Sequence, residues 1–191
     1  GEESRMAVHR MRSVCDAVLI GGNTAVQDDP LLTCRIRGGH DPARVVVTSH
    51  PERLRGLRMF SDGAARNIVI VPRDVTDDRL EGLPETGAEI IRLPARNGLI
   101  DTRAILAELG ERGIVTLIVE GGGHVAGAFL RDRSVDRIVL FFAPVMFGEA
   151  IRSVSGWNAA TPADGRRFSI SRIRRSGEDL MVEALPLEGS E

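Results

Sequence analysis

The run from Ile114 to Val119 constrains the fold of this chain more than any other segment. It is a strand-length stretch, IVTLIV, that leads through Glu120 and three glycines into a predicted helix, Val125–Arg131. Short runs that are almost wholly apolar are typical of strands buried on both faces. A strand, a glycine turn and a helix in immediate succession therefore predict an α/β fold.

Further apolar runs of similar length occur along the chain, and helical patterns separate several of them. We predict strands at Asp16–Gly22, Ala43–Ser49, Asn67–Pro72, Ala88–Leu93 and Arg137–Ala143. We predict helices at Glu3–Arg12 and Asp101–Arg112, and loops at Gln27–Pro30 and Arg152–Arg167. Asp101 can cap the second of these helices and Gly113 can end it. Strands that alternate with helices favour a three-layer α/β architecture with a mostly parallel central sheet.

The C-terminal part of the chain has a different pattern. Phe168–Arg174 alternates apolar and polar residues, and Leu180–Leu185 is a second strand candidate beyond a turn at Ser176-Gly177-Glu178. We therefore expect an antiparallel hairpin at the edge of the sheet. Since no repeat, low-complexity segment or linker divides the chain, residues 1–191 are expected to form a single domain.

The composition is that of an ordinary globular protein, and it narrows the chemistry. Apolar residues make up 42% of the chain, charged residues 27%, and the formal net charge is −2. No apolar stretch approaches the roughly 20 residues of a membrane span, so we expect a cytoplasmic protein that binds neither nucleic acid nor membrane. All 25 basic residues are Arg and Tyr is absent, which excludes a Lys or Tyr of this chain as a catalytic group. The cysteines and histidines have no metal-ligand spacing, so no metal site is expected.

Glu120-Gly121-Gly122-Gly123 is the first of two segments that suggest chemistry. Glycines let backbone N–H groups approach a diphosphate, and the N-terminus of the following helix adds partial positive charge. An ordinary tight turn is also compatible with these glycines. A carboxylate at the end of a buried strand is costly without a partner. Glu120 therefore either binds a ligand, as strand ends in α/β sheets do, or forms a salt bridge with an Arg.

The second segment runs from a predicted strand through two glycines to Asp28, Asp29 and Arg35. A carboxylate here suits a place near a nicotinamide, and a guanidinium suits bidentate binding of phosphate. Adjacent Asp residues before Pro30 are also typical of a capping turn. Residue type alone leaves both interpretations open.

Together, the two segments and the strand after them resemble a known family. DAVLIGGNTAVQDDPLLTCR (residues 16–35), LIVEGGGHVAGAFL (117–130) and VDRIVLFFAPVMFG (135–148) are similar to the reductase domain of the bacterial bifunctional riboflavin-biosynthesis deaminase/reductase and to its stand-alone relatives. The resemblance extends from Ser4 to the end of the chain and is faint between Pro51 and Asp101. It implies a dihydrofolate-reductase-like fold, NADPH as cofactor and a homodimer.

The resemblance also implies roles for individual positions. Thr24 and Asp28 match contacts to the nicotinamide nucleotide, with Asp28 close to the reacting carbon, and Ser49 matches a contact near the 2′-phosphate. The loop under the cofactor diphosphate corresponds to Gly122, Gly123, His124, Val125, Ala126, Gly127 and Ala128. The substrate-binding positions correspond to Arg12, Leu32, Arg35 and Glu120.

A domain of this family uses NADPH to reduce the ribose of a pyrimidine ribosylamino 5-phosphate to ribityl, and the resemblance gives Asp28 and Glu120 catalytic roles. Two alternatives remain: a reductase of the same fold that acts on dihydrofolate or another pterin, and a non-catalytic NADPH-binding module. The zinc signature of the deaminase half, H-x-E with P-C-x-x-C, is absent, so we expect reduction without deamination. The family normally begins with a strand that carries a Ser-x-Asp-Gly-Lys-like segment. We expect this strand to be missing, since Gly1 falls where the first helix begins.

Overall fold

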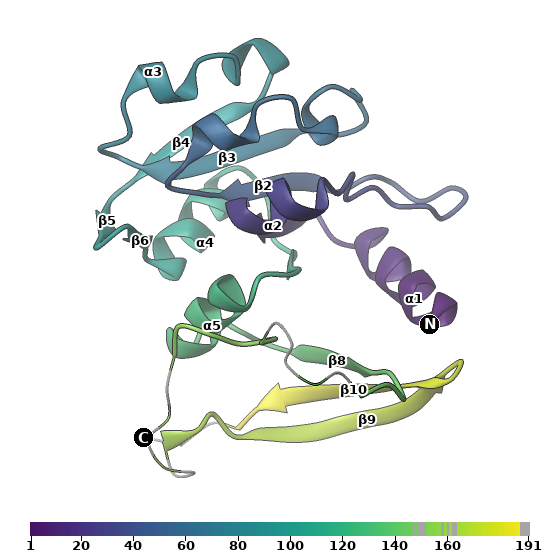
Figure 1. Ribbon diagram of the computed structural model, residues 1–191. Coiled ribbons are helices and arrows are strands. Elements are labelled where there is room, and N and C mark those ends of the chain that lie inside the picture. The colour runs from purple at the N-terminus through teal and green to yellow at the C-terminus, as the bar shows by residue number, and fades with distance from the viewer. Residues whose placement is uncertain (147, 149–151, 158, 160, 162–163, 188–191) are drawn as a thin grey trace.

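The computed structural model describes residues 1–146, 148, 152–157, 159, 161 and 164–187 (Figure 1). Its α-helices are α1 (Glu2–Arg12), α2 (Gly22–Asp28), α3 (Asp77–Leu80), α4 (Thr102–Glu111) and α5 (Gly123–Arg131). Its strands are β1 (Ala17–Gly21), β2 (Ala43–Val47), β3 (Asn67–Pro72), β4 (Glu89–Leu93), β5 (Ala95–Arg96), β6 (Leu99–Ile100), β7 (Leu117–Val119), β8 (Ile138–Phe142), β9 (Phe168–Ser176) and β10 (Asp179–Pro186). Short 3-10 helices are η1 (Pro51–Leu54), η2 (Arg58–Phe60) and η3 (Pro84–Thr86).

The central sheet of the described chain has five strands in the order β4-β3-β2-β1-β7. Every neighbouring pair in this sheet is parallel. The carboxyl ends of the strands therefore lie along one edge, which is where open α/β sheets bind ligands. The predicted mostly parallel central sheet is confirmed.

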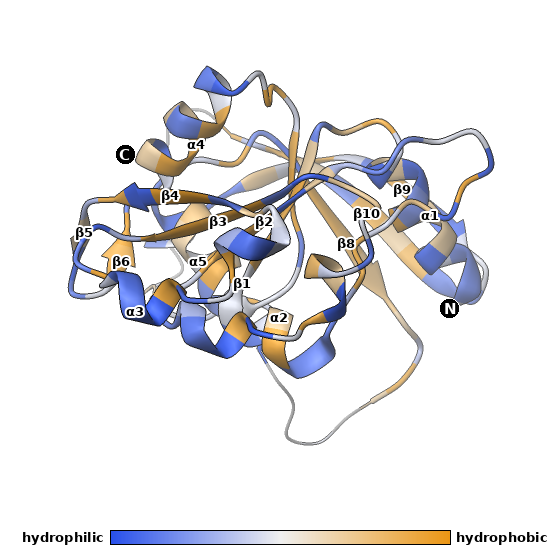
Figure 2. Ribbon diagram, turned by 90° about the horizontal axis from the view of Figure 1, so that it is seen from above, coloured by the Kyte–Doolittle hydropathy of each residue, from blue (hydrophilic) through white to orange (hydrophobic). Residues whose placement is uncertain are grey.

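Alternating residues of the central strands supply two cores, one on each face of the sheet. Val18 and Ile20 of β1 pack on one face with Met59 of η2. Leu19, between them, packs on the opposite face with Ile105 of α4. Figure 2 shows mainly hydrophobic residues along the central strands, and helices in which hydrophilic and hydrophobic residues alternate. The sheet is thus the middle layer of three, as the sequence predicts.

The predicted C-terminal hairpin is present, but it belongs to a second sheet. β9 and β10 pair antiparallel, and β10 also pairs antiparallel with β8, which gives the order β8-β10-β9. The position differs from the expected one, because the hairpin pairs with β8 and with no strand of the central sheet. The alternation of apolar and polar residues along a strand predicts which face of the strand is buried. It does not predict which other strand it pairs with, because that depends on contacts between residues distant in sequence.

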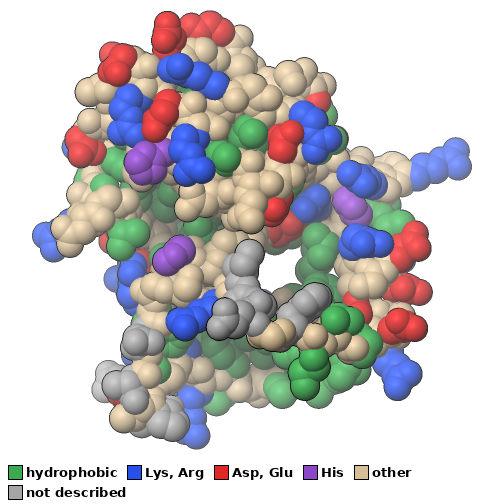
Figure 3. Space-filling view, in the orientation of Figure 1, with side chains coloured by type: hydrophobic (Ala, Val, Ile, Leu, Met, Phe, Trp, Pro, Cys, Tyr) green, Lys and Arg blue, Asp and Glu red, His purple; other side chains and the backbone are tan. Residues whose placement is uncertain are grey.

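β7 and β8 each have an open edge within the described residues. β7 pairs with β1 alone, and β8 pairs with β10 alone. Figure 3 shows an opening through the molecule between the half that holds the central sheet and the half that holds the hairpin. α1 connects the two halves, since Ser4 Oγ donates a hydrogen bond of 2.5 Å to Asp179 Oδ2 at the start of β10.

The segment after β1 is helical where part of it was predicted to be a loop. The prediction is wrong for Gln27 and Asp28, which end α2, and Asp29 follows in a left-handed conformation with φ of 39°. Ala25 is fully buried in the core beneath α2. Packing against the sheet stabilises a helix of seven residues that would not be stable on its own.

β7 is shorter than the predicted strand Ile114–Val119. The backbone N–H groups of Val115 and Thr116 donate to the carboxylate of Asp16 at 2.9 and 2.7 Å. These amides are therefore satisfied by a side chain and not by a neighbouring strand. In contrast, β3 has the predicted limits, and α4 begins after Asp101 as its N-cap, as predicted.

The predicted loop Arg152–Arg167 contains no α-helix or strand among its described residues, and residues 158, 160, 162 and 163 lie outside the described residues. No helix in the described ranges is long and apolar enough to cross a bilayer. Across the same ranges, no three His, Cys, Asp or Glu side chains are grouped so that they could hold a metal ion.

Candidate functional site

Three neighbouring strands bring most of the predicted site residues to one edge of the central sheet. β2 leads to Ser49, β1 leads to Thr24, and β7 leads to Glu120. Glu120 remains bound to the sheet, because its backbone N–H donates to Leu19 O at 2.9 Å. Segments that are about 100 residues apart in sequence are therefore neighbours in space, as the parallel sheet predicts.

Glycine is required where these strand ends meet. Gly121 and Gly122 have φ values of 74° and 78°, a left-handed conformation that glycine adopts readily. A Cβ on Gly122 would lie 2.8 Å from Thr24 Oγ1, and a Cβ on Gly21 would lie 2.8 Å from Val125 Cγ2. The glycines thus allow the first turn of α5 to lie directly against α2 and the end of β1.

Glu120 forms a salt bridge with Arg12 of α1. Arg12 Nε donates to Oε1 at 2.8 Å and Nη2 donates to Oε2 at 2.5 Å, which makes the pair bidentate. The two side chains are 13% and 21% exposed. Of the interpretations left open for Glu120, the salt bridge is therefore present. It joins two positions that the family resemblance assigns to substrate binding, so it does not exclude a ligand.

The two adjacent carboxylates after β1 have different environments. Arg58 holds Asp29, since its backbone N–H and its Nε donate to the Asp29 carboxylate at 2.9 and 2.7 Å. The bond from the Arg58 backbone is the main reason that the pKa of Asp29 lies below its usual value. The Asp28 side chain is exposed, and its carboxylate has no hydrogen-bond or ion-pair partner in the described part of the chain. Asp29 thus has the structural role, and Asp28 is free to contact a ligand.

Leu32 and Arg35 lie in the segment after α2, beside α1. Leu32 is 3% exposed and belongs to the core, so only a small part of its surface can touch a ligand. The Arg35 side chain is exposed, and its guanidinium has no partner among the described residues. Arg35 is therefore an available cation in the segment whose Thr33 carbonyl oxygen accepts a hydrogen bond from Arg12.

Ser49 lines a pocket of about 330 Å³ at the ends of β2 and β3, together with Asp74, Arg79 and others. Arg79 Nη2 donates to Ser49 O at 2.9 Å, and Arg79 also forms an ion pair of 2.9 Å with Glu52. Sequence reasoning missed Arg79. The residue comes from the short helix α3, 30 positions beyond Ser49, and no local pattern connects the two.

The predicted diphosphate loop, Gly122–Ala128, has a packing role on one face. Gly123 O accepts a hydrogen bond of 2.9 Å from Ser155 N. A Cβ on Gly127 would overlap Ser155 O. These two glycines therefore let a later segment of backbone pack on α5, a reason that the sequence alone does not reveal. His124, between them, has an exposed side chain.

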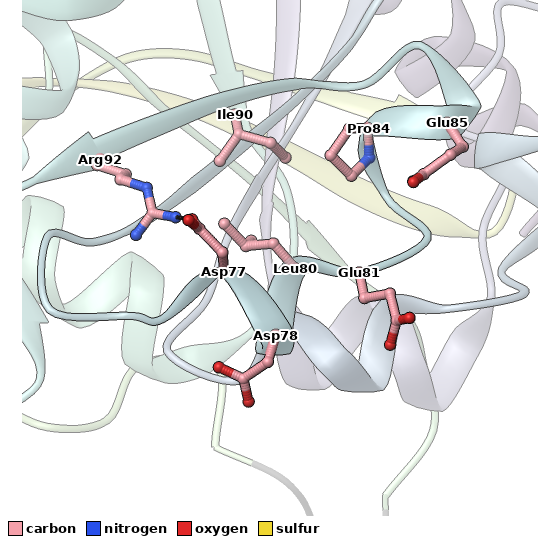
Figure 4. A pocket seen from close by; sticks show the side chains of 8 residues that line it. All are labelled: Asp77, Asp78, Leu80, Glu81, Pro84, Glu85, Ile90 and Arg92. Carbon is pink, nitrogen blue, oxygen red and sulfur yellow. Dashed lines mark hydrogen bonds and ion pairs between the residues drawn. The ribbon is translucent and has the colours of Figure 1, made fainter.

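A larger hollow, of about 580 Å³, lies on α3 and β4 (Figure 4). Its lining includes four carboxylates, from Asp77, Asp78, Glu81 and Glu85. Arg92, its one cationic lining residue among those described, forms an ion pair with Asp77. An excess of carboxylates repels a diphosphate, so this hollow does not suit a dinucleotide.

The sequence of the chain matches the family model described as the RibD C-terminal domain over residues 1–182. The chain belongs to this family. It is 31% identical over 182 residues to the riboflavin biosynthesis protein RibD of Aquifex aeolicus, with 95% of the chain and 49% of the relative covered. It is 32% identical over 188 residues to a 2,5-diamino-6-ribosylamino-4(3H)-pyrimidinone 5′-phosphate reductase of Methanothermobacter thermautotrophicus, with 96% and 85% covered. The chain thus spans about half the length of RibD.

Solved structures support the RibD assignment. A deaminase/reductase from Thermotoga maritima superposes with a TM-score of 0.80 at 30% identity, over 96% of this chain and 48% of that one. The riboflavin biosynthesis reductase Rib7 of Saccharomyces cerevisiae has the same fold, with a TM-score of 0.74 at 20% identity over 97% and 81%. The family resemblance and the dihydrofolate-reductase-like fold expected from the three sequence segments are confirmed.

The strand ends fit a nicotinamide dinucleotide, the cofactor class that a RibD reductase domain implies. α5 begins after Gly122 with no side-chain cap among the described residues. The Val125 N–H donates to Gly122 O at 3.0 Å, which leaves the N–H groups of Gly123 and His124 for an anion. A Cβ at Gly122 would fill the space against Thr24. Glycine turn, uncapped helix and neighbouring hydroxyl together form a cradle suited to a diphosphate.

Proposed function

We propose that this chain is an NADPH-dependent reductase of riboflavin biosynthesis, which converts the ribose of a pyrimidine ribosylamino 5-phosphate into ribityl. The observation that carries the proposal is the bidentate Arg12–Glu120 pair at the end of β7, next to the uncapped first turn of α5. Relatives whose names describe pyrimidinone 5′-phosphate reductases support it. A carboxylate accepts hydrogen bonds from hydroxyl groups, and a neighbouring guanidinium binds phosphate, so the pair suits a substrate that carries both hydroxyl groups and a phosphate.

Reduction at C1′ requires an open sugar. The ribosylamine ring opens to an imine between C1′ and the exocyclic nitrogen, O4′ becomes a hydroxyl, and a proton on the nitrogen makes C1′ more electrophilic. C1′ would take up the hydride that a nicotinamide cofactor supplies when bound, which would leave a secondary amine on the ribityl chain. The contribution of the protein is mainly orientation, since the two carbons have to approach within about 3–3.5 Å.

We assign Asp28 and Glu120 to the open-chain sugar. Asp28 is exposed at the end of α2 and without a partner in the described chain, so its carboxylate accepts hydrogen bonds from sugar hydroxyls and favours the protonated imine. Glu120, at the end of β7, binds the sugar with the part of its carboxylate that Arg12 leaves accessible. Arg35, whose guanidinium is available, binds the 5-phosphate together with Arg12.

We propose NADPH over NADH because of the pocket beside Ser49. Arg79 lies within hydrogen-bond distance of the Ser49 backbone, and a guanidinium is the group best suited to a 2′-phosphate. The Arg79→Ala variant is expected to raise KM for NADPH and to leave KM for NADH unchanged. An equal increase for both dinucleotides contradicts the assignment.

The experiment that tests the function follows NADPH oxidation with the deaminated and the undeaminated pyrimidine ribosyl phosphates supplied in turn. Turnover of one of them, lost in Asp28→Ala, supports the proposal and also identifies the order of deamination and reduction. Turnover of dihydrofolate instead favours the pterin alternative. Binding of NADPH without turnover of any of these substrates favours the non-catalytic alternative.

We propose that the opening between β7 and β8 accommodates the first strand that family members carry ahead of their first helix. The open edges of β7 and β8 support this proposal, because a strand between them would pair with both and join the two sheets. Adding a peptide with the sequence of a family-type first strand to residues 1–191 is expected to raise the thermal midpoint and to slow amide exchange in β7 and β8. Unchanged exchange in both strands contradicts it.

We propose that the chain forms a homodimer through the exposed face of the second sheet. Phe142 and Leu180 are directly paired, Ile173 lies on the same face, and these side chains are 54%, 45% and 60% exposed. Contiguous apolar surface of this kind marks interaction sites. Light scattering is expected to show a dimer for the wild type and a monomer for Ile173→Arg, and a monomeric wild type contradicts the proposal.

We also propose a cytoplasmic location, which cell fractionation tests.

A further inference from the structure

One backbone carbonyl in the proposed substrate segment is held by two side chains of α1. Thr33 O accepts a hydrogen bond of 3.2 Å from Arg12 Nη1, and it lies 3.1 Å from His9 Nδ1. His9 and Arg12 are three residues apart, so they project from the same face of the helix. The proposed chemistry gives Arg12 a role and gives His9 none.

The segment that contains Thr33 has a conformation that requires support. The residue before Thr33, Leu32, has φ of 52°, and Asp29 at the start of the segment has φ of 39°. Residues other than glycine keep such left-handed conformations only where the surroundings determine them, and they gather at binding sites. Arg58 holds the Asp29 end. The side chains of α1 hold the other end, next to Arg35.

We propose that His9 is a positioning residue, whose hydrogen bond to Thr33 O fixes the segment so that Arg35 faces the substrate phosphate. The inference rests on the proposed function for the identity of the ligand. The clamp itself rests only on the contacts between α1 and the segment. These contacts are reciprocal, because Cys34 Sγ lies 3.7 Å from the backbone oxygen of His9.

The inference takes the tautomer of His9 that carries a hydrogen on Nδ1. A carbonyl oxygen only accepts, so in this tautomer Nδ1 donates in the 3.1 Å contact with Thr33 O. The backbone N–H of Arg35 is 3.4 Å from the same nitrogen. This contact is longer and therefore the weaker of the two, and it forms only in the other tautomer, in which Nδ1 accepts.

The chemistry of the side-chain amides gives a specific set of test variants. In His9→Asn, the amide nitrogen is bonded to Cγ, as Nδ1 is in histidine, and it can donate to Thr33 O. In His9→Gln, the amide nitrogen is one bond further out, in the place of Nε2, and His9→Ala has no donor. His40→Ala is the matched control, since His40 Nε2 contacts another backbone oxygen, Cys15 O, at 3.1 Å.

The first readout is amide exchange of the peptide that spans residues 32–37, which is independent of turnover. Exchange is expected to be faster in His9→Ala and His9→Gln by about fivefold, the effect of one ordinary hydrogen bond. His9→Asn and His40→Ala are expected to retain the wild-type rate. The second readout is kinetic: KM for the pyrimidine substrate rises by a similar factor of about five in His9→Ala, while KM for NADPH is unchanged.

The two readouts separate failure of the clamp from failure of the proposed function. Wild-type exchange in His9→Ala, or exchange in His9→Asn as fast as in His9→Ala, overturns the clamp even if the wild type turns over substrate. Absence of turnover by the wild type overturns the proposed function, and the exchange pattern still decides whether His9 holds the segment. A rise of KM for NADPH equal to that for the pyrimidine substrate overturns the role of His9 toward the phosphate.

Discussion

The five-stranded central sheet and the three-stranded sheet β8-β10-β9 are both rich in apolar residues, but among the described residues only the central sheet is covered on both faces. β1 and β3 are buried over their whole length, because helices lie on both sides of the central sheet (Figure 1). β9 is exposed over nearly all of its length, and β10 is exposed at several positions. The central sheet therefore contains its own cores, whereas the second sheet leaves apolar surface for a partner.

The candidate site shows a related contrast. Asp29 and Arg58, like Arg12 and Glu120, satisfy each other within the chain. Asp28 and Arg35 have no such partner in the described residues. The Asp29–Arg58 pair holds the site in shape. The Arg12–Glu120 pair has to exchange part of its mutual contact for contacts with a substrate, whereas Asp28 and Arg35 can bind a ligand without losing a partner.

The largest effect on stability is expected from Asp62→Ala, which removes the partner of a buried cation in the central half. Arg44 has a side chain with 0% exposure and forms a bidentate pair of 2.9 Å with Asp62. Without Asp62 the charge is buried and unpaired, which costs about 3–5 kcal/mol. Urea unfolding measures the loss. Asp78→Ala, at an exposed carboxylate, is the control, and a similar small change in both variants contradicts the account of the core.

A smaller effect is expected from Gly127→Ala, on the helix that leads from the central sheet to the second sheet. A Cβ at this position would overlap Ser155 O, so the later segment has to move, at a cost of about 1–3 kcal/mol. Gly110→Ala in α4 is the matched control, because a Cβ there meets nothing within 4 Å. The control is expected to gain about 0.5–1 kcal/mol of stability from helix propensity. Changes of the same sign in both variants contradict the packing described for α5.

The pH dependence of the central sheet is expected to include a contribution from Glu89 on β4. Hydrogen bonds from Arg66 and then Arg112 hold the pKa of Glu89 below its usual value. A lowered folded-state pKa stabilises the fold above the unfolded pKa of about 4.3, and this stabilisation is lost as the pH falls through the folded value. The difference in urea midpoint between the wild type and Glu89→Gln is therefore expected to be largest near neutral pH and to shrink in acid. A difference that stays constant with pH contradicts this explanation.

The smallest effect is expected from Ile170→Ser on the second sheet. Ile170 is 60% exposed, so the free energy of unfolding of the monomer is expected to change by less than about 0.5 kcal/mol. Urea unfolding at low protein concentration gives this value without a contribution from association. If Ile170→Ser lowers the free energy of unfolding as much as a core substitution does, this face of the second sheet is covered within the monomer. The second sheet would then not differ from the central sheet in its burial.

Sequence reasoning succeeds where the signal is local. The β3 run Asn67–Pro72 is apolar after its first residue, the polar Asn67, and its limits are predicted correctly. α2 was missed because it depends on Ala25 packing against the sheet and not on strong helix formers. The partners of the site residues are also distant in sequence. Glu120 and Arg12 are 108 positions apart, so residue type suggests that Glu120 needs a partner but does not identify Arg12.

The most direct test of the proposed function uses NADPH that carries deuterium at the transferred position of C4. The account predicts that the pyrimidine product gains one deuterium at C1′ of the ribityl chain, and that Asp28→Ala greatly slows its formation. Product without deuterium at C1′, or deuterium found on the heterocyclic ring, would contradict hydride transfer to the sugar at this site.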